Sequence, residues 1–246
     1  MEIIYGINSI RDLLRRHQDG WEKIIIASGR TGSSVKEIID IAQAEKIPLE
    51  FYDRKRLTKM AGTPDHQGVV AFRKSFIYAD MDQLIKNRNR QSAFDLILIL
   101  DSIVDPQNLG SIIRTAYCMG ANGVIIPEDR SAQVTAAVNK TSAGSVQHIP
   151  IVKVVNLANT IDDLKDKGFW IFGADTRGGQ NIKDMDFNCS VVLVLGSEAK
   201  GIRPLVKQKC DFLITIPLPG DFDSLNVSVA SGIILFEMIS RRRRGV

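Results

Sequence analysis

The chain has 246 residues, of which 44% are hydrophobic and 24% are charged. This length suits one large domain or two small ones, and the composition excludes a disordered tail, a collagen-like fibre and a disulfide-stapled miniature. No apolar run reaches the ~18–20 residues of a membrane helix, and the first residues do not read as a signal peptide. Three widely spaced cysteines, Cys118, Cys189 and Cys210, indicate reduced thiols of a cytoplasmic protein rather than a metal site.

The formal net charge of +4 is concentrated at the beginning of the chain. Residues 1–91 hold 16 Lys and Arg against 12 Asp and Glu, whereas residues 92–246 hold 16 of each. This excess favours a polyanionic partner, although a solvated surface would have the same composition. The basic run Arg241–Arg244 could add nonspecific affinity or form a disordered tail.

A small α/β module is predicted over residues 1–75. Asn8 or Ser9 can cap a helix that runs to Arg16, and Ser33 or Ser34 can cap a second helix with an apolar face. A basic helix is expected at 54–60 and strands at 23–27, 49–52 and 68–72. Residues 76–93 form the predicted linker to a second module, since 87–92 are polar and without apolar periodicity, although Met81, Leu84 and Ile85 hint at a short helix before them.

A second α/β module is predicted over residues 94–246. Its strands are nearly continuous apolar runs, which are typical of a parallel sheet covered on both faces. The expected strands are 95–100, 123–126, 169–173, 190–195 and 212–216, and the expected helices are 109–119, 132–139, 157–167, 202–207 and 225–240. Because ligands of such sheets bind beyond the carboxyl ends of the strands, the loops there are the candidate site.

The first candidate loop follows strand 95–100. Asn108 is a natural N-cap, and Arg114 lies in sequence among the apolar Ile112, Ile113 and Ala116. Both side chains could face a phosphate-bearing substrate. Alternatively, Asn108 is only a cap and Arg114 only pairs with a carboxylate.

The second candidate loop ends strand 190–195 with Gly196, followed by Glu198 and Gly201. Glu198 could orient a substrate or complement the dipole of the helix that follows. The loop is not a P-loop, and the chain has no Gly-x-Gly, which argues against a nucleotide- or NAD-binding enzyme of the usual kind.

The third candidate loop, 216–226, contains two prolines and leads into the last helix. Ser224 can cap this helix, whose first N–H groups could then face a ligand near Asn226. The alternative is an ordinary cap followed by a buried helix.

Together, the three loops resemble motifs 1, 2 and 3 of the SpoU (TrmH-type) branch of the SPOUT RNA methyltransferases. The matching stretches are Asp105-Pro106-x-Asn108-x-Gly110-x-x-x-Arg114-Thr115-Ala116, Leu195-Gly196-x-Glu198-x-x-Gly201, Ile216-Pro217 and Ser224-Leu225-Asn226-Val227-Ser228-Val229-Ala230. The first module resembles the substrate-binding domain of the family, and the run from His66 to Ala71 is typical of it.

The resemblance implies a deep trefoil knot that binds S-adenosylmethionine, a homodimer with the active site at its interface, and no metal. The lack of a long apolar run predicts no membrane partner. The residues that it implies for the cofactor are Leu195, Gly196, Gly201, Ile216, Leu218, Leu225, Asn226 and Ala230. Those that it implies for catalysis are Arg114, Asn108, Glu198, Ser224 and Asn226.

The implied reaction is methylation of a ribose 2′-hydroxyl in RNA, similar to that of the enzyme that modifies a guanosine of 23S rRNA. The candidate RNA contacts are Arg11, Arg15, Arg16, Arg54, Lys55, Arg56 and Lys59, each of which could also be simply solvated. Alternatives are a tRNA ribose methyltransferase and a non-catalytic RNA-binding ribosome-assembly factor of the same fold.

Overall fold

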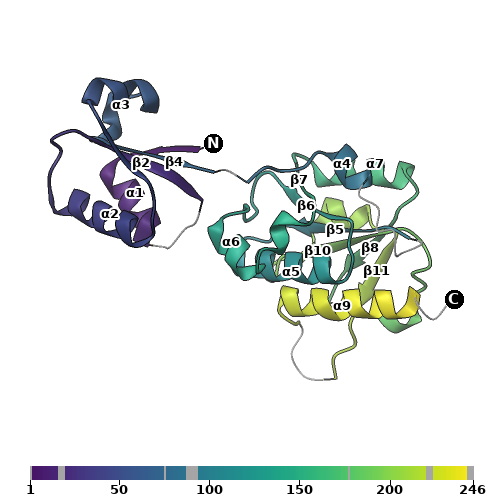
Figure 1. Ribbon diagram of the computed structural model, residues 1–246. Helices are drawn as coiled ribbons and strands as arrows, with labels where there is room; N and C mark the ends of the chain where they lie inside the picture. Colours follow the sequence, from purple (N-terminus) through teal and green to yellow (C-terminus); the bar gives the residue numbers. More distant parts are fainter. Residues whose placement is uncertain are drawn as a thin grey trace. The chain divides into compact units, whose positions relative to one another are not determined.

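The computed structural model describes residues 2–15, 20–74, 76–86, 94–176, 178–219 and 224–242 (Figure 1). The chain divides into two compact units, Met1–Ile77 and Tyr78–Val246. Each unit has its own sheet flanked by helices, so the predicted α/β class is confirmed for both.

The first unit is built on a four-stranded sheet in the order β1-β4-β2-β3, in which only β2 and β3 are parallel. Helices α1 and α2 cover one face, and Leu57 of α3 packs on the other. Its elements are β1 (Glu2–Tyr5), α1 (Ile7–Arg15), β2 (Trp21–Ala27), α2 (Ser33–Ala44), β3 (Leu49–Tyr52), α3 (Arg54–Ala61), η1 (Pro64–His66) and β4 (Val69–Arg73).

The starts of the first two helices differ from prediction. Helix α1 begins at Ile7, so Asn8 and Ser9 lie inside its first turn and do not cap it. Helix α2 is preceded by Gly32, and neither Ser33 nor Ser34 provides a side-chain cap. Strand β1 was not predicted from the sequence, because four residues carry too little periodicity to distinguish a strand.

The second unit is built on a seven-stranded sheet in the order β7-β6-β5-β10-β8-β11-β9, and every pairing is parallel. Its strands are β5 (Leu96–Asp101), β6 (Gly123–Pro127), β7 (Ile151–Val154), β8 (Trp170–Ala174), β9 (Gln180–Asn181), β10 (Val191–Gly196) and β11 (Phe212–Thr215). Strands β7 and β9 were not predicted. The knot implied by the resemblance stays a prediction.

Helices cover both faces of this sheet (Figure 1). Apolar residues of α4, α7 and α8 share one core with alternate residues of β5, β8 and β10, while α5 packs against α9 and α6 on the other side. The helices are α4 (Met81–Lys86), α5 (Pro106–Cys118), α6 (Ala136–Thr141), α7 (Leu157–Asp166), α8 (Pro204–Gln208) and α9 (Val227–Arg242), with the short η2 (Ser145–Gln147) and η3 (Ile182–Asp184). Each helix in this set is too short or too polar to cross a membrane.

Part of the predicted linker packs on the second unit. The N–H of Ala79 donates to the carbonyl of Ile151 over 2.9 Å, and Leu84 of α4 is fully buried in the core. Residues 78–86 therefore extend the second unit. Of the other predicted linker residues, 76–77 belong to the first unit and 87–93 lie outside the described residues.

Arg242 is a structural residue and not part of a disordered tail. Its guanidinium donates to four backbone carbonyls, those of Phe94, Asp95, Phe187 and Cys189, over 2.8–3.3 Å. Burial lowers the pKa of Arg242. The prediction of a disordered or RNA-binding run is thus wrong for Arg242, because a long side chain at the end of α9 can reach inward. Arg243 and Arg244 lie outside the described residues.

Replacing Arg242 with alanine should lower the free energy of unfolding by about 2–4 kcal/mol, because several carbonyls lose a charged donor. Urea denaturation would measure the loss. Arg241→Ala is the matched control, since Arg241 only pairs with Glu237 one turn earlier and should lose at most about 1 kcal/mol. Equal losses in the two variants would contradict the anchoring role.

Candidate active site

The three candidate loops converge at the carboxyl edge of the second sheet. Strands β5 and β10 are direct neighbours, with Asp101 paired to Gly196 at their ends, and β11 lies beyond β8 in the same sheet. The loops after β10 and β11, together with the residues after β8 and the start of α9, enclose a cavity of about 590 Å³, whereas the loop after β5 contributes no residue to its lining. Its lining includes Ala174, Asp175, Thr176, Leu195, Gly196, Ser197, Glu198, Lys200, Gly201, Ile216, Pro217, Leu218, Ser224, Leu225, Val227 and Ala230.

Most residues predicted to hold a cofactor line this cavity. They are Leu195, Gly196, Gly201, Ile216, Leu218, Leu225 and Ala230. Asn226 is not part of the lining, although its neighbours Leu225 and Val227 are. Asp175 and Thr176 also line the cavity but were not predicted from the sequence. They directly follow β8, so they could have been predicted, because ligands bind beyond the carboxyl ends of parallel strands.

The loop after β10 is a tight turn whose two ends are joined by backbone hydrogen bonds. The N–H of Ser197 donates to the carbonyl of Gly201 over 3.1 Å, and the N–H of Gly201 donates back over 2.8 Å. Gly201 has φ +65°, which favours glycine. A Cβ on Gly196 would overlap the backbone of Gly201 and Ile202. Both motif glycines therefore have a steric reason to be glycine.

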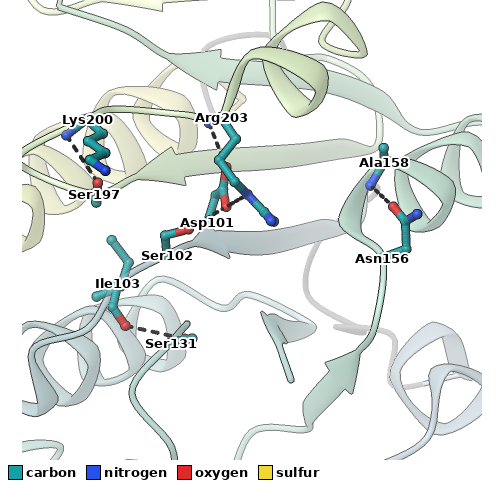
Figure 2. A network of polar contacts seen from close by, with 9 residues as sticks. All are labelled: Asp101, Ser102, Ile103, Ser131, Asn156, Ala158, Ser197, Lys200 and Arg203. Carbon is teal, nitrogen blue, oxygen red and sulfur yellow. Dashed lines mark hydrogen bonds and ion pairs between the residues drawn. The ribbon is translucent and has the colours of Figure 1, made fainter. Parts of the chain in front are cut away.

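An ion pair between the buried Asp101 and the partly exposed Arg203 joins this loop to the end of β5 (Figure 2). Asp101 is fully buried, and its carboxylate accepts from the backbone N–H of Arg203 over 2.8 Å and from Arg203 Nε over 2.6 Å. Ser102 Oγ donates to the same carboxylate over 3.0 Å. Asp101 and Arg203 were missed in the sequence, since 102 positions separate them. Their contact holds the loop that carries Glu198 against the end of β5.

Glu198, Asn108 and Asn226 form one hydrogen-bonded cluster. Glu198 Oε1 accepts from Asn108 Nδ2 over 3.2 Å, from Asn226 Nδ2 over 2.5 Å and from the N–H of Val227 over 3.3 Å. Asn226 Nδ2 also donates to Asn108 Oδ1 over 3.0 Å. One carboxylate therefore ties α5, the loop after β10 and the start of α9 together. Glu198 lies at the N-terminus of α9, not of the helix that follows it in sequence.

Two helices that carry residues of this cluster are capped by other residues than predicted. Helix α5 is capped by Asp105, whose carboxylate accepts from the N–H of Gln107, so Asn108 lies inside the helix and its side chain is free to reach Glu198. Helix α9 begins at Val227, and Asn226 Oδ1 accepts from the N–H groups of Ser228 and Val229. Asn226 therefore takes the capping role predicted for Ser224, which lines the cavity instead.

Arg114 is exposed on α5, while Ile112, Ile113 and Ala116 are buried beneath it. Within the described part of the chain, its guanidinium has no hydrogen-bond or ion-pair partner, so no described carboxylate of the same chain pairs with it. Arg114 does not belong to the cavity lining. Among the predicted catalytic residues, Asn108, Glu198 and Asn226 are thus hydrogen-bonded to one another. Arg114 makes no hydrogen bond to any of them.

An apolar stripe lies exposed on α9. Val229, Ile233 and Phe236 are 50%, 41% and 61% exposed, at the spacing of one helix face. Helix α5 packs beside α9, where Gly232 faces Thr115. The stripe and Arg114 therefore belong to two adjoining helices.

The predicted RNA contacts of the first unit fall into two groups. Arg11 donates to Ser34 Oγ over 3.0 Å, and Arg15 pairs with Glu37 over 2.6 Å. Arg54, Lys55, Arg56 and Lys59 of α3 are exposed, and the guanidinium of Arg56 stacks on Tyr52, 3.7 Å from its ring centroid. Arg16 lies outside the described residues.

His66 supports the loop before β4. It is buried, its Nδ1 accepts from the N–H of Gly68 over 3.0 Å, and its Nε2 lies 3.0 Å from Thr58 Oγ1. Burial, followed by the charge of Arg54, lowers the pKa of His66. A neutral imidazole in this position is structural. The described residues contain no cluster of His, Cys, Asp or Glu that could hold a metal.

An all-parallel sheet whose strand-end loops enclose a cavity defines an α/β domain with its ligand site at the carboxyl edge. Two family models match the chain, the SpoU rRNA Methylase family over residues 95–236 and RNA 2′-O ribose methyltransferase substrate binding over residues 3–79. The chain belongs to the SpoU rRNA methylase family, and the resemblance seen in its motifs is confirmed.

Relatives and solved structures agree with this assignment. The TrmH family protein YacO of Bacillus subtilis (strain 168) is 38% identical over 98% of this chain and 96% of its own length. The SpoU methyltransferase AviRb from Streptomyces viridochromogenes, in complex with AdoMet, has a TM-score of 0.62 at 24% identity, covering 99% of this chain and 91% of AviRb. The TrmH/SpoU tRNA modifying enzyme of A. aeolicus has a TM-score of 0.58 at 30% identity, and the match covers 66% of this chain and 81% of that enzyme.

Proposed function

We propose that this protein transfers the methyl group of S-adenosylmethionine to a ribose 2′-hydroxyl of RNA. The observation that carries the proposal is the cavity at the carboxyl edge of the second sheet, which is lined by the second and third motif loops and by the residues after β8. A cavity of about 590 Å³ suits a nucleoside-sized ligand. Its apolar walls fit an adenine ring, while Asp175 and Thr176 offer polar groups.

When bound, S-adenosylmethionine supplies an electrophilic methyl carbon whose bond to sulfur breaks as the bond to the 2′-oxygen forms. Arg114 would hold the RNA phosphate beside that ribose and stabilise negative charge on the oxygen. Because arginine side chains stay protonated in proteins, the hydroxyl proton passes to a phosphate oxygen or to water and not to Arg114. The cluster of Asn108, Glu198 and Asn226 orients the ribose, and Ser224 offers a hydroxyl at the cavity wall.

The active site would be completed in a homodimer. Arg114 is exposed and lies outside the cavity lining of its own chain, and the apolar stripe of Val229, Ile233 and Phe236 lies on the adjoining helix. Burial of this stripe against a second copy would favour association. Such a dimer would bring the Arg114 of one protomer toward the cavity of the other.

We favour a guanosine of 23S rRNA as the methyl acceptor. The family model over the second unit is described for rRNA. The tRNA modifying enzyme of A. aeolicus covers only 66% of this chain, so the likeness to a tRNA enzyme does not extend over the whole chain. A tRNA substrate is the second candidate, because the name of YacO gives tRNA and rRNA together. We place the activity in the cytoplasm.

The proposal is tested with purified protein, S-adenosylmethionine labelled in its methyl group, and two acceptors, deproteinised 23S rRNA and bulk tRNA. We expect label in the 23S rRNA and, after alkaline hydrolysis, in a dinucleotide that resists cleavage because its 2′-oxygen is methylated. Label confined to tRNA would select the second candidate. Label in a base, or in neither RNA, would refute ribose methylation.

A further inference from the structure

The first unit contains a cleft of its own, of about 430 Å³. It lies at the carboxyl ends of the parallel strands β2 and β3, where the loop after β2, the start of α3 and the loop before β4 meet. The lining consists of Ala27, Ser28, Gly29, Arg30, Arg54, Gln67 and Gly68. Neither Arg30 nor this cleft belongs to the proposed methyl-transfer site in the second unit.

Backbone hydrogen bonds hold the walls of the cleft in place. The N–H of Ala27 donates to Gly68, that of Ser28 to Tyr52 and that of Arg30 to Ala27, all over 2.8–2.9 Å. Gly29 and Gly68 have φ of +77° and +86°, so both turns depend on glycine. The Arg30 side chain lies over Gly68, because a Cβ built there would come within 3.2 Å of Arg30 Cγ. The cleft is a fixed feature of the unit.

The groups that line the cleft are donors. Neither Arg30 nor Arg54 has a hydrogen-bond or ion-pair partner for its side chain within the described part of the chain, and the lining contains no Asp or Glu. Gln67 Oε1 accepts from the N–H of Ile7 over 3.0 Å, which leaves the Gln67 amide NH₂ to donate. The charge of Arg54 also contributes to the lowered pKa of the neighbouring His66.

Several other basic residues of the unit have partners already. Arg15 pairs with Glu37, Lys23 with Glu50, and Arg11 bonds Ser34. The nearest carboxylate in sequence, Asp53, accepts from the N–H of Arg56 at the start of α3. Arg30 and Arg54 therefore place two guanidiniums with free donors in one cleft, which is an arrangement suited to an anion.

We propose that this cleft is a phosphate subsite for the RNA substrate, in which Arg30 and Arg54 bind a backbone phosphate, with Ser28 and Gln67 as further donors. The inference rests on the proposed function, because it takes RNA as the substrate. It adds Arg30 to the candidate RNA contacts and selects Arg54 from the basic residues of α3. The subsite would act on RNA affinity and not on the methyl-transfer step.

The test compares the full chain with the double variant Arg30→Gln/Arg54→Gln, using fluorescein-labelled U20 RNA as the probe and fluorescence anisotropy in 0.05–0.3 M salt. We expect the double variant to bind about 20-fold more weakly at 0.1 M salt, and the slope of log K against log salt to fall by about 1.5. Arg30→Lys/Arg54→Lys should recover the slope, because the charges remain, but only part of the affinity.

The matched control is Lys46→Gln. Lys46 is exposed and lies just before β3, at the opposite edge of the sheet from the cleft. Its replacement therefore removes one positive charge from the unit without changing the lining of the cleft. Equal weakening by the Lys46 single variant and the Arg30 single variant, or an unchanged salt slope in the double variant, would overturn the subsite. Circular dichroism confirms that each variant is folded.

Methyl transfer to deproteinised 23S rRNA separates the two proposals. If the wild type transfers methyl groups, we expect the double variant to raise KM for RNA with kcat unchanged, and an unchanged KM would refute the subsite alone. If the wild type transfers none while the double variant still loses U20 affinity with the predicted slope, the methyltransferase proposal fails and the subsite stands.

Discussion

Replacing Arg114 with alanine should lower kcat for methyl transfer about 10²–10³-fold and leave the affinity for S-adenosylmethionine unchanged. The loss follows from removing one charged donor aimed at developing negative charge. The affinity is spared because Arg114 does not line the cavity. Single-turnover transfer to RNA and calorimetric titration of the cofactor measure the two quantities. Lys86→Ala, on α4 across the sheet and with a side chain 80% exposed, is the control for a lost surface charge.

The same variant tests whether Arg114 acts across the dimer. An equal mixture of Arg114→Ala and Gly196→Ala protomers forms heterodimers in which one cavity is intact and faces an intact Arg114 from the partner. At a cofactor concentration that fills the wild-type cavity but not the Gly196→Ala cavity, we expect about a quarter of wild-type activity in the mixture, although each homodimer alone is nearly inactive. No recovery after verified exchange of protomers would place Arg114 and the cavity in one chain and refute the interface.

Arg114→Lys tests the fate of the proton. If Arg114 only binds phosphate and stabilises charge, the lysine variant should retain part of the activity and show the wild-type pH profile of kcat. A profile displaced along the pH axis in Arg114→Lys would instead assign the proton to residue 114.

The sheet of the second unit could be predicted because its central strands are buried on both faces. Runs such as 95–100 and 190–195 are apolar throughout, and buried parallel strands are the simplest explanation of such runs. Locating the strands locates the loops that follow them, so the cavity could be predicted too. Strand β7 was missed because Ile151–Val154 is short and includes a lysine.

The caps of α5 and α9 were predicted wrongly, because more than one residue near each helix start has a side chain that can cap. Before α5, both Asp105 and Asn108 are suitable, and Pro106 at the first helical position favours Asp105. Before α9, Asn226 is held by Glu198, a partner 28 positions away that local sequence does not reveal. The ion pair of Asp101 with Arg203 is a tertiary contact of the same kind.

The largest effect on cofactor binding is expected from Gly196→Ala. A methyl group at Gly196 would overlap the backbone of Gly201 and Ile202, and backbone cannot move aside as a flexible side chain can. The loop is held from both ends, by its paired hydrogen bonds between Ser197 and Gly201 and by the bonds of Arg203 to Asp101. The clash must therefore displace the cavity wall. We expect S-adenosylmethionine to bind about 100-fold more weakly, which corresponds to roughly 3 kcal/mol.

Gly168→Ala separates this steric effect from the general effect of replacing a glycine. Gly168 has φ +88° and no atom within 4 Å of its added Cβ, and it lies at the amino end of β8, at the opposite edge of the sheet. Its replacement should cost about 1 kcal/mol of stability through backbone strain and leave cofactor affinity intact. If both variants bind the cofactor as the wild type does while Gly196→Ala remains folded, the loop after β10 is not the wall of the cofactor site.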